Sequence, residues 1–168
     1  VIQPDVLLMD GETLTPLGTS MDLHAGQLVD RVGVAMGLPF PSGPHLETLA
    51  RQGNAKALVP VSMDEKSLQC HLSGAEAQLM RMIQKGENPN DIAAEVYSIL
   101  CRTVLRLLKA AADQTGTNEI LLAGGVMSSS LLRELLLERN EKRRLQLHLH
   151  FGRPEYSGDN AVGVALIG

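Results

Sequence analysis

The chain has 168 residues, enough for one domain with a hydrophobic core or for one lobe of a larger protein. Apolar residues make up 44% of it and aromatic residues only 2%, so the core has to be built from aliphatic side chains and methionine. The formal net charge of -4 argues against broad, non-specific binding of nucleic acid by this chain alone.

Cysteine usage and hydropathy indicate a cytoplasmic protein. Cys70 and Cys101 do not form a C-x-x-C pair, which argues against a zinc knuckle and suits a reducing compartment. No signal peptide is visible, and no apolar run is long enough to span a bilayer. Because the chain begins at Val1, close to a predicted strand, we expect a fragment of a longer protein.

The first half of the chain predicts a hairpin and two helices. Asp10-Gly11 is a typical turn between strands over 5–9 and 12–15, and residues 16–20 are expected to end the hairpin. Apolar residues at helical spacing predict a helix over 22–36, with Asp22 as a possible N-cap and Gly37 at its end. A second helix begins at Pro44 and stops at Gly53.

The second half predicts alternating strands and helices. A short strand over 68–72 leads into a helix over 73–85 capped by Ser73, and Asn90 caps the longest helix, 91–114. The remaining predicted elements are a strand over 120–123, a helix over 128–141, a strand over 145–151 and a small apolar helix over 159–167. This order predicts an α/β lobe, residues 1–168, in which helices pack on a mixed sheet.

The most informative segment is the predicted strand that runs into Gly124-Gly125 and then into Ser128-Ser129-Ser130 at a helix start. Glycines let a ligand approach the backbone, and a helix N-terminus offers N–H groups to an anion. A tight turn that binds nothing is an equally good interpretation of this motif alone. The loop at Gly43, with Glu47 one turn into its helix, is similar, because a carboxylate there can accept hydrogen bonds from a ribose.

Other polar positions have a structural and a functional interpretation. Asp22 and Asp30 lie roughly on one helix face, two turns apart, and can equally be surface acids. Asp159 follows a strand at a helix start, so it is either an N-cap or a ligand for a metal. His148 and His150 share a strand face and could bind a metal, but no carboxylate nearby in sequence completes such a site. The basic run 139–144 is expected to be a solvated helix end.

Several segments, in order and with compatible spacing from about residue 17 onward, resemble one family. They are residues 17–31, 38–47, 72–74, 121–126 with 132–133, and 156–160. The chain is similar to the threonylcarbamoyltransferases of tRNA adenosine-37 modification (the TsaD/YgjD/Gcp family), long labelled O-sialoglycoprotein endopeptidases. The combination of motifs is far more specific than any one of them.

The resemblance implies the C-terminal lobe of a two-lobe fold of the actin, Hsp70 and sugar-kinase type (ASKHA), with the active site between the lobes. It implies ATP or threonylcarbamoyl-adenylate as ligand, and iron or zinc to activate the carbamoyl group for attack by the adenosine amine. By motif position the nucleotide would be contacted by Asp30, Gly43, Glu47, Gly124, Gly125 and Ser129, the last of which stands where the family has Asn. Asp159 would be the metal ligand of this lobe.

The departures from the family pattern shape our expectations. The His-x-x-x-His metal pair of the N-terminal lobe is absent here, and Glu76 replaces a family Lys. We therefore expect a divergent paralogue whose C-terminal portion is inactive alone, with iron or zinc bound only by the full-length protein. Expected partners are the missing N-terminal lobe, a TsaB-like paralogue or a second copy, and tRNA through the full-length protein; no membrane is expected. The alternative is a non-catalytic, nucleotide-binding or dimerising paralogue. We find no motif that supports the peptidase label.

Overall fold

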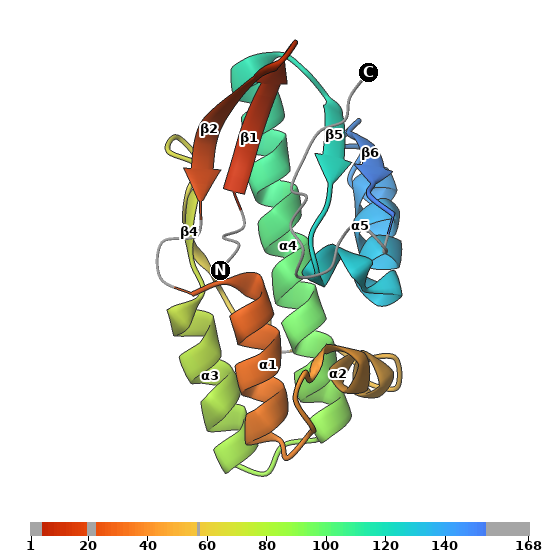
Figure 1. Cartoon of the computed structure of the whole chain (residues 1–168). Helices are drawn as coiled ribbons and strands as arrows, with labels where there is room; N and C mark the ends of the chain where they lie inside the picture. Colours follow the sequence, from red (N-terminus) through yellow and green to blue (C-terminus); the bar gives the residue numbers. More distant parts are fainter. Residues whose placement is uncertain (1–4, 20–22, 57, 154–168) are drawn as a thin grey trace.

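The computed structural model describes residues 5–19, 23–56 and 58–153 and has the α/β architecture that the sequence predicts (Figure 1). The strands are β1 (Asp5–Asp10), β2 (Thr13–Thr19), β3 (Ser62–Asp64), β4 (Gln69–His71), β5 (Glu119–Leu122) and β6 (His148–Phe151). The helices are α1 (Ala25–Ala35), α2 (Gly43–Ala50), α3 (Ser73–Gln84), α4 (Pro89–Thr115) and α5 (Ser130–Lys142), with a 3-10 turn, η1 (Val126–Ser128).

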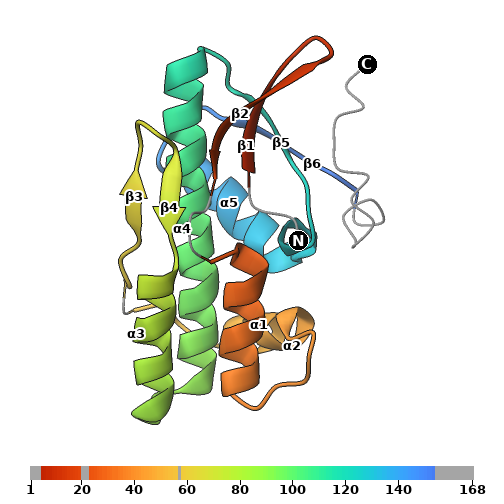
Figure 2. The same cartoon turned by 60° about the vertical axis from the view of Figure 1, so that its left-hand side comes forward.

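The long helix α4 is the axis of the molecule. Helices α1, α2 and α3 pack around one half of it, and the strands and α5 lie beside the other half (Figures 1 and 2). Most of its side chains are buried, from Ile92 near its start to Ala111 near its end. No described helix is long and apolar enough to cross a membrane.

The described strands form three separate pairs, so the prediction of one mixed sheet is wrong for this part of the chain. β1–β2 and β3–β4 are antiparallel, and β5–β6 is parallel, with α5 as the connection. In each pair, the two strands are consecutive in the sequence and are joined by the segment between them. The two antiparallel pairs meet through side chains such as Leu17 and Leu68, which pack with Leu107 of α4, rather than through a shared ladder of hydrogen bonds.

The hairpin is confirmed, but its second strand is longer than expected. Gly11 takes a positive φ of 60° in the turn, as a short hairpin requires. Strand β2 continues through Pro16 to Thr19, because a register shift opposite Val6 and Leu7 accommodates the proline. A proline lacks the N–H needed in a ladder, and a strand irregularity is one of the few places where a sheet tolerates it.

Helix boundaries follow the predictions with local corrections. Helix α4 begins at Pro89, and the side chain of Asn88, not that of Asn90, is the cap; it accepts a hydrogen bond from the Asn90 N–H at 2.8 Å. Gly116 ends α4 with φ 76°, as expected. Leu72 occupies the N-cap of α3, so Ser73 is its first residue rather than its cap.

Three further expectations concern helix starts and a strand. Helix α1 begins at Ala25 with His24 as the N-cap, so the cap is not Asp22, which lies outside the described residues. Helix α5 begins at Ser130, after η1, rather than at Ser128. The predicted helix over 159–167 lies outside the described residues, and β3 was not predicted.

One glycine sets the distance between α1 and the loop before α2. A Cβ atom built on Gly33 would lie 2.2 Å from the Cβ of Ser42, which is itself fully buried. No real pair of carbon atoms approaches so closely, so α1 and this loop have to move apart if a methyl group is added.

We expect Gly33→Ala to lower the free energy of unfolding by ~1–3 kcal/mol, the usual cost of overpacking. The matched control is Gly74→Ala in α3, where a Cβ would meet no atom within 4 Å and where alanine should be neutral or slightly stabilising. Urea unfolding of the two variants measures the difference. Equal stability of both would contradict the close contact.

Candidate functional site

Asp30 holds the loop that leads into α2. Its Oδ1 accepts a hydrogen bond from the Ser42 backbone N–H at 2.8 Å, and the Ser42 hydroxyl donates to the carbonyl of Pro39 at 3.0 Å. The hydroxyl of Tyr97 on α4 donates to the carbonyl of Gly43 at 3.2 Å. Asp30 on α1 and Gly43 at the start of α2 therefore lie beside the same hydrogen-bonded loop, although they are 13 positions apart in sequence.

Glu47 joins α2 to the first turn of α5. Its Oε1 accepts hydrogen bonds from the Ser130 hydroxyl at 2.7 Å and from the Leu131 backbone N–H at 2.9 Å. A carboxylate at a helix N-terminus satisfies N–H groups that have no partner within the helix and is favoured by the helix dipole. The sequence predicts a ligand-binding role for Glu47; the structure shows that it also caps α5 from another helix.

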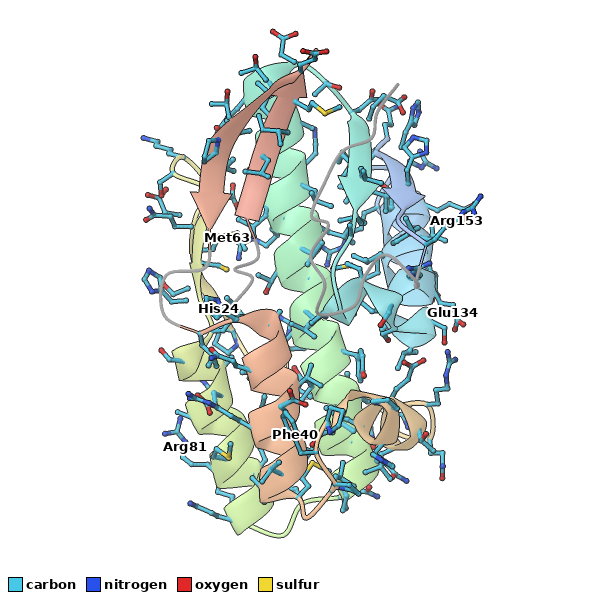
Figure 3. All side chains as sticks on the ribbon, viewed as in Figure 1. His24, Phe40, Met63, Arg81, Glu134 and Arg153 are labelled. Carbon is cyan, nitrogen blue, oxygen red and sulfur yellow. The ribbon has the colours of Figure 1, made fainter. Side chains whose placement is uncertain are left out.

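Arg51 completes this contact. Its guanidinium donates to Glu47 at 3.1 Å, to Ser130 at 2.8 Å and to both carboxylate oxygens of Glu134, at 3.0 and 3.1 Å. Glu134, labelled in Figure 3, comes from α5, so Arg51 bridges the same two helices as Glu47. Sequence reasoning missed this residue, because its partners on α5 lie about 80 positions away.

The pKa of Glu47 reports these bonds. Burial raises the pKa, but hydrogen bonds from Ser130 and Leu131, with smaller ones from Ser129 and Arg51, outweigh it, so the pKa lies below its ordinary value of 4.5. Burial, together with the negative charge of Glu47, raises the pKa of Tyr97 to about 12.

The glycine pair forms the turn between β5 and η1. Gly124 has φ 112°, which side chains other than glycine rarely adopt, and a Cβ there would meet no atom within 4 Å. Gly125 has an ordinary φ of -58°. Ser129 caps α5, because its side chain accepts a hydrogen bond from the Leu132 N–H at 3.1 Å. The turn is thus open on the Gly124 side and fixed on the Ser129 side.

Arg133 ties this turn to the end of β6, a role that sequence reasoning did not assign. Its Nε donates to the carbonyl of Met127 at 2.5 Å and its Nη2 to that of Gly152 at 2.8 Å. Its guanidinium lies 5.2 Å from the ring centroid of Phe151. The segments that follow the two parallel strands are therefore held together by one side chain of α5.

The structure brings together Asp30, Gly43, Glu47 and Ser129, and Gly124-Gly125 precede Ser129 in the same short connection. Asp159 lies outside the described residues. A cavity of about 320 Å³ lies between α2, α4 and α5. Arg51, Tyr97 and Arg139 line it, whereas the glycines of the predicted site do not. The nucleotide-binding roles remain predictions.

No described group of three histidine, cysteine or acidic side chains is arranged to hold a metal ion. His148 and His150 share an exposed face of β6, as predicted, but the expectation that no carboxylate lies near them is wrong. Glu119 on the paired strand contacts His148 Nδ1 at 2.5 Å and His150 Nε2 at 2.8 Å. Hydrogen bonds from His150 and then His148 lower the pKa of Glu119, so the three side chains form a polar cross-strand contact.

Comparison with known proteins agrees with the motif resemblance. The model of the family described as "TsaD: tRNA N6-adenosine threonylcarbamoyltransferase" matches residues 4–166. A tRNA N6-adenosine threonylcarbamoyltransferase of Moorella thermoacetica is 35% identical over 165 residues, covering 94% of this chain and 48% of the relative. That of Bacillus licheniformis is 31% identical, with 90% and 46% covered. A probable bifunctional tRNA threonylcarbamoyladenosine biosynthesis protein of Thermoplasma volcanium is 29% identical, with 90% and 28% covered.

We expect Glu47→Gln to destabilise the chain by ~1 kcal/mol near neutral pH, a low value for bonds to a charged acceptor because the carboxylate is partly solvated. A carboxylate whose folded pKa is depressed stabilises the fold above its unfolded pKa and loses that contribution as pH falls through the folded value. The difference from wild type should therefore be constant above about pH 4.5 and shrink below it.

Urea unfolding of wild type and Glu47→Gln tests this expectation, with a measurement at about every pH unit between pH 3 and 7. Glu134→Gln is the control, because it removes an exposed partner of Arg51 and leaves the α5 cap intact. It should have the smaller effect. A larger loss for Glu134→Gln would show that Arg51, not Glu47, joins the two helices.

Proposed function

Since the chain belongs to the tRNA N6-adenosine threonylcarbamoyltransferase family, we propose that it is the nucleotide-binding lobe of a protein that acts in tRNA adenosine-37 modification. The chain spans about half the length of the curated transferases that it matches. In this proposal residues 1–168 form a single lobe, the C-terminal lobe of an ASKHA fold. The parallel β5–α5–β6 unit, in which the glycine turn follows β5, supports this assignment.

One observation carries the nucleotide-binding part of the proposal. Glu47 and Ser129, which lie far apart in the sequence, meet at the start of α5, a few residues after the open turn at Gly124, and Asp30 holds the loop that leads into the helix of Glu47. Residues placed together only by the fold are more informative than a single motif. Backbone approach at the turn and N–H groups at a helix start are what a nucleotide requires.

The chemistry of the ligand follows from these groups. The hydrogen bonds that Arg51, Ser130 and Leu131 donate to Glu47 go to Oε1, and in this proposal Oε2 accepts a bond from a ribose hydroxyl. The absence of a side chain at Gly124 lets a flat base lie against the backbone. The ligand class is ATP or an adenylate such as threonylcarbamoyl-adenylate.

The described residues do not fit a complete metal site, because no three ligating side chains among them are suitably arranged. We therefore derive no step of the reaction through a metal in this lobe. Iron or zinc would be bound by the full-length protein, with Asp159 as the ligand contributed here. The role of this lobe is to hold and orient the nucleotide for a reaction that the other half of the protein completes.

The alternative proposal is a non-catalytic paralogue that binds a nucleotide or dimerises with a TsaB-like protein or a second copy. The open turn supports nucleotide binding equally in both proposals. They differ in the remaining half of the protein, where a His-x-x-x-His pair would favour the transferase.

We expect this chain to bind ATP with a Kd on the order of millimolar, because only one wall of the ligand site is present. Gly125→Val should abolish this binding, since it adds bulk beside the turn at a position whose φ of -58° accepts a side chain. Calorimetric titration with ATP measures both. Gly74→Ala, far along the chain in α3, is the matched control and should bind as wild type does.

Two results would change the proposal. Unaltered ATP binding by a folded Gly125→Val variant would remove the glycine turn from the site. Micromolar binding by the wild-type chain would show that this lobe carries the nucleotide site alone, in favour of the non-catalytic alternative.

A further inference from the structure

The last turns of α5 and the two residues after it carry three arginines that make no ion pair within the described part of the chain. Arg139, Arg143 and Arg144, which we name the arginine strip, lie on the last turns of α5 and directly after it, where α5 packs against α4. Arg143 and Arg144 are exposed, and Arg139 is half-buried.

The other cations of this surface have acidic partners. Arg102 pairs with the buried Glu95 at 3.1 Å, and Arg106 pairs with Glu65 at 2.8 Å. Lys109 and Lys142 pair with acids one turn away on their own helices. In the described part of the chain, none of the three arginines of the strip makes an ion pair. Among the described residues, the one side-chain hydrogen bond of the strip is a long contact of 3.5 Å from Arg139 to the Ser98 hydroxyl.

The positive charges lie close enough to affect one another. Burial lowers the pKa of Arg102, and the charges of Arg139 and Arg143 lower it further, against the opposing effect of Glu95. Like charges held together raise the free energy of the folded state unless an anion is bound. In a chain with a net charge of -4, such a concentration on one seam calls for a specific explanation.

The strip also lies between two hollows. Arg139 lines the cavity of about 320 Å³ that reaches Arg51 and Tyr97, next to the candidate nucleotide site. Arg143 lines a smaller hollow of about 140 Å³, together with the ion pairs Arg106–Glu65 and Lys109–Asp113, so within the ranges that the structure describes it is the unpaired cation of that lining. Arg139 and Arg143 are one helical turn apart, ~6 Å along the axis, so the cations form a row rather than one compact pocket.

We infer that the arginine strip binds the phosphodiester backbone of an RNA that extends from the candidate nucleotide site along the seam between α4 and α5. A row of guanidinium groups can contact successive phosphates and offers little to a single compact anion. A membrane surface fits less well, because Leu132 and Leu136 of α5 are buried in the core and Leu137 is the one leucine of this helix that is exposed, which is too little for an apolar face to insert. This inference rests on the proposed function, in which the substrate is an RNA.

The test is binding of a fluorescently labelled RNA stem-loop, followed by anisotropy at salt concentrations from ~50 to ~200 mM. We expect the triple variant R139Q/R143Q/R144Q to bind ~10–100-fold more weakly at low salt. It should also reduce the slope of log affinity against log salt by about 2–3, because each phosphate contact contributes nearly one.

The matched control is R31Q/R81Q/K85Q, which changes the net charge equally on exposed positions of α1 and α3. Helix α3 lies across α4 from α5 (Figure 1), and Arg81 is labelled in Figure 3. The control should bind RNA with the salt slope of wild type. Circular dichroism verifies folding; if the triple variant is unfolded, the double variant R143Q/R144Q, at two exposed positions, decides with an expected slope change of about 2.

Three outcomes would overturn the inference: no change in the strip variant, equal losses in both triple variants, or wild-type binding to phosphatidylserine vesicles without binding to RNA. Failure of the proposed function is distinguishable. If RNA binding depends on the strip but ATP titration shows no nucleotide site, the proposed function fails and the strip remains. If ATP binds through the glycine turn but RNA ignores the strip, the reverse holds.

Discussion

The Glu47 carboxylate connects the helices packed around the start of α4 with the β5–α5–β6 unit. Glu47 belongs to the helices that surround the start of α4, and it accepts hydrogen bonds from the first turn of α5, which belongs to the β5–α5–β6 unit. Because only η1 and Ser129 separate the glycine turn from α5, the position of that turn depends on this contact. The charge of Glu47 is therefore needed for structure at the same point where the family resemblance implies a ligand.

A second side chain, that of Arg133 on α5, fixes the segments that follow β5 and β6. Arg133 bonds to the carbonyls of Met127 and Gly152, one in each segment that follows a parallel strand. In open α/β sheets, ligands bind beyond the carboxyl ends of parallel strands. A candidate site held by Glu47 and Arg133 is pre-organised by partly buried bonds, whereas the open side at Gly124 remains accessible.

Local patterns predicted most elements, since helices α1 to α5 and strands β4 to β6 follow from apolar spacing and from glycines such as Gly37 and Gly116 that end helices. Strand β3 escaped prediction, because three residues are too few to show alternation. Asn88 and Asn90 are both good cap residues, so the sequence pattern alone does not separate them. Pro89, which favours the first position of a helix, makes Asn88 the cap.

The candidate site shows where local information ends. Gly43, Glu47 and Gly124 could be selected from short motifs, but the partners of Glu47 lie more than 80 positions away, and no periodicity indicates them. The same holds for Arg51 and for the contact of Glu119 with two histidines, which depends on the parallel register of β5 and β6. Long-range pairing is a property of the packed fold, so single-sequence reasoning recovers the residues of a site more readily than their contacts.

The bond from Tyr97 to Gly43 has a consequence for how the site responds to its surroundings. With a pKa of about 12, the Tyr97 phenol remains a neutral donor across the physiological range. Glu47, four positions after Gly43, has a pKa below its ordinary value and is protonated only in acid. The loop before α2 is therefore anchored to α4 by a bond that acid does not break, and α5 is anchored by one that acid does. Acidification would weaken the contact between Glu47 and α5 while the bond from Tyr97 to Gly43 persists, so the two ends of this contact region respond differently to pH.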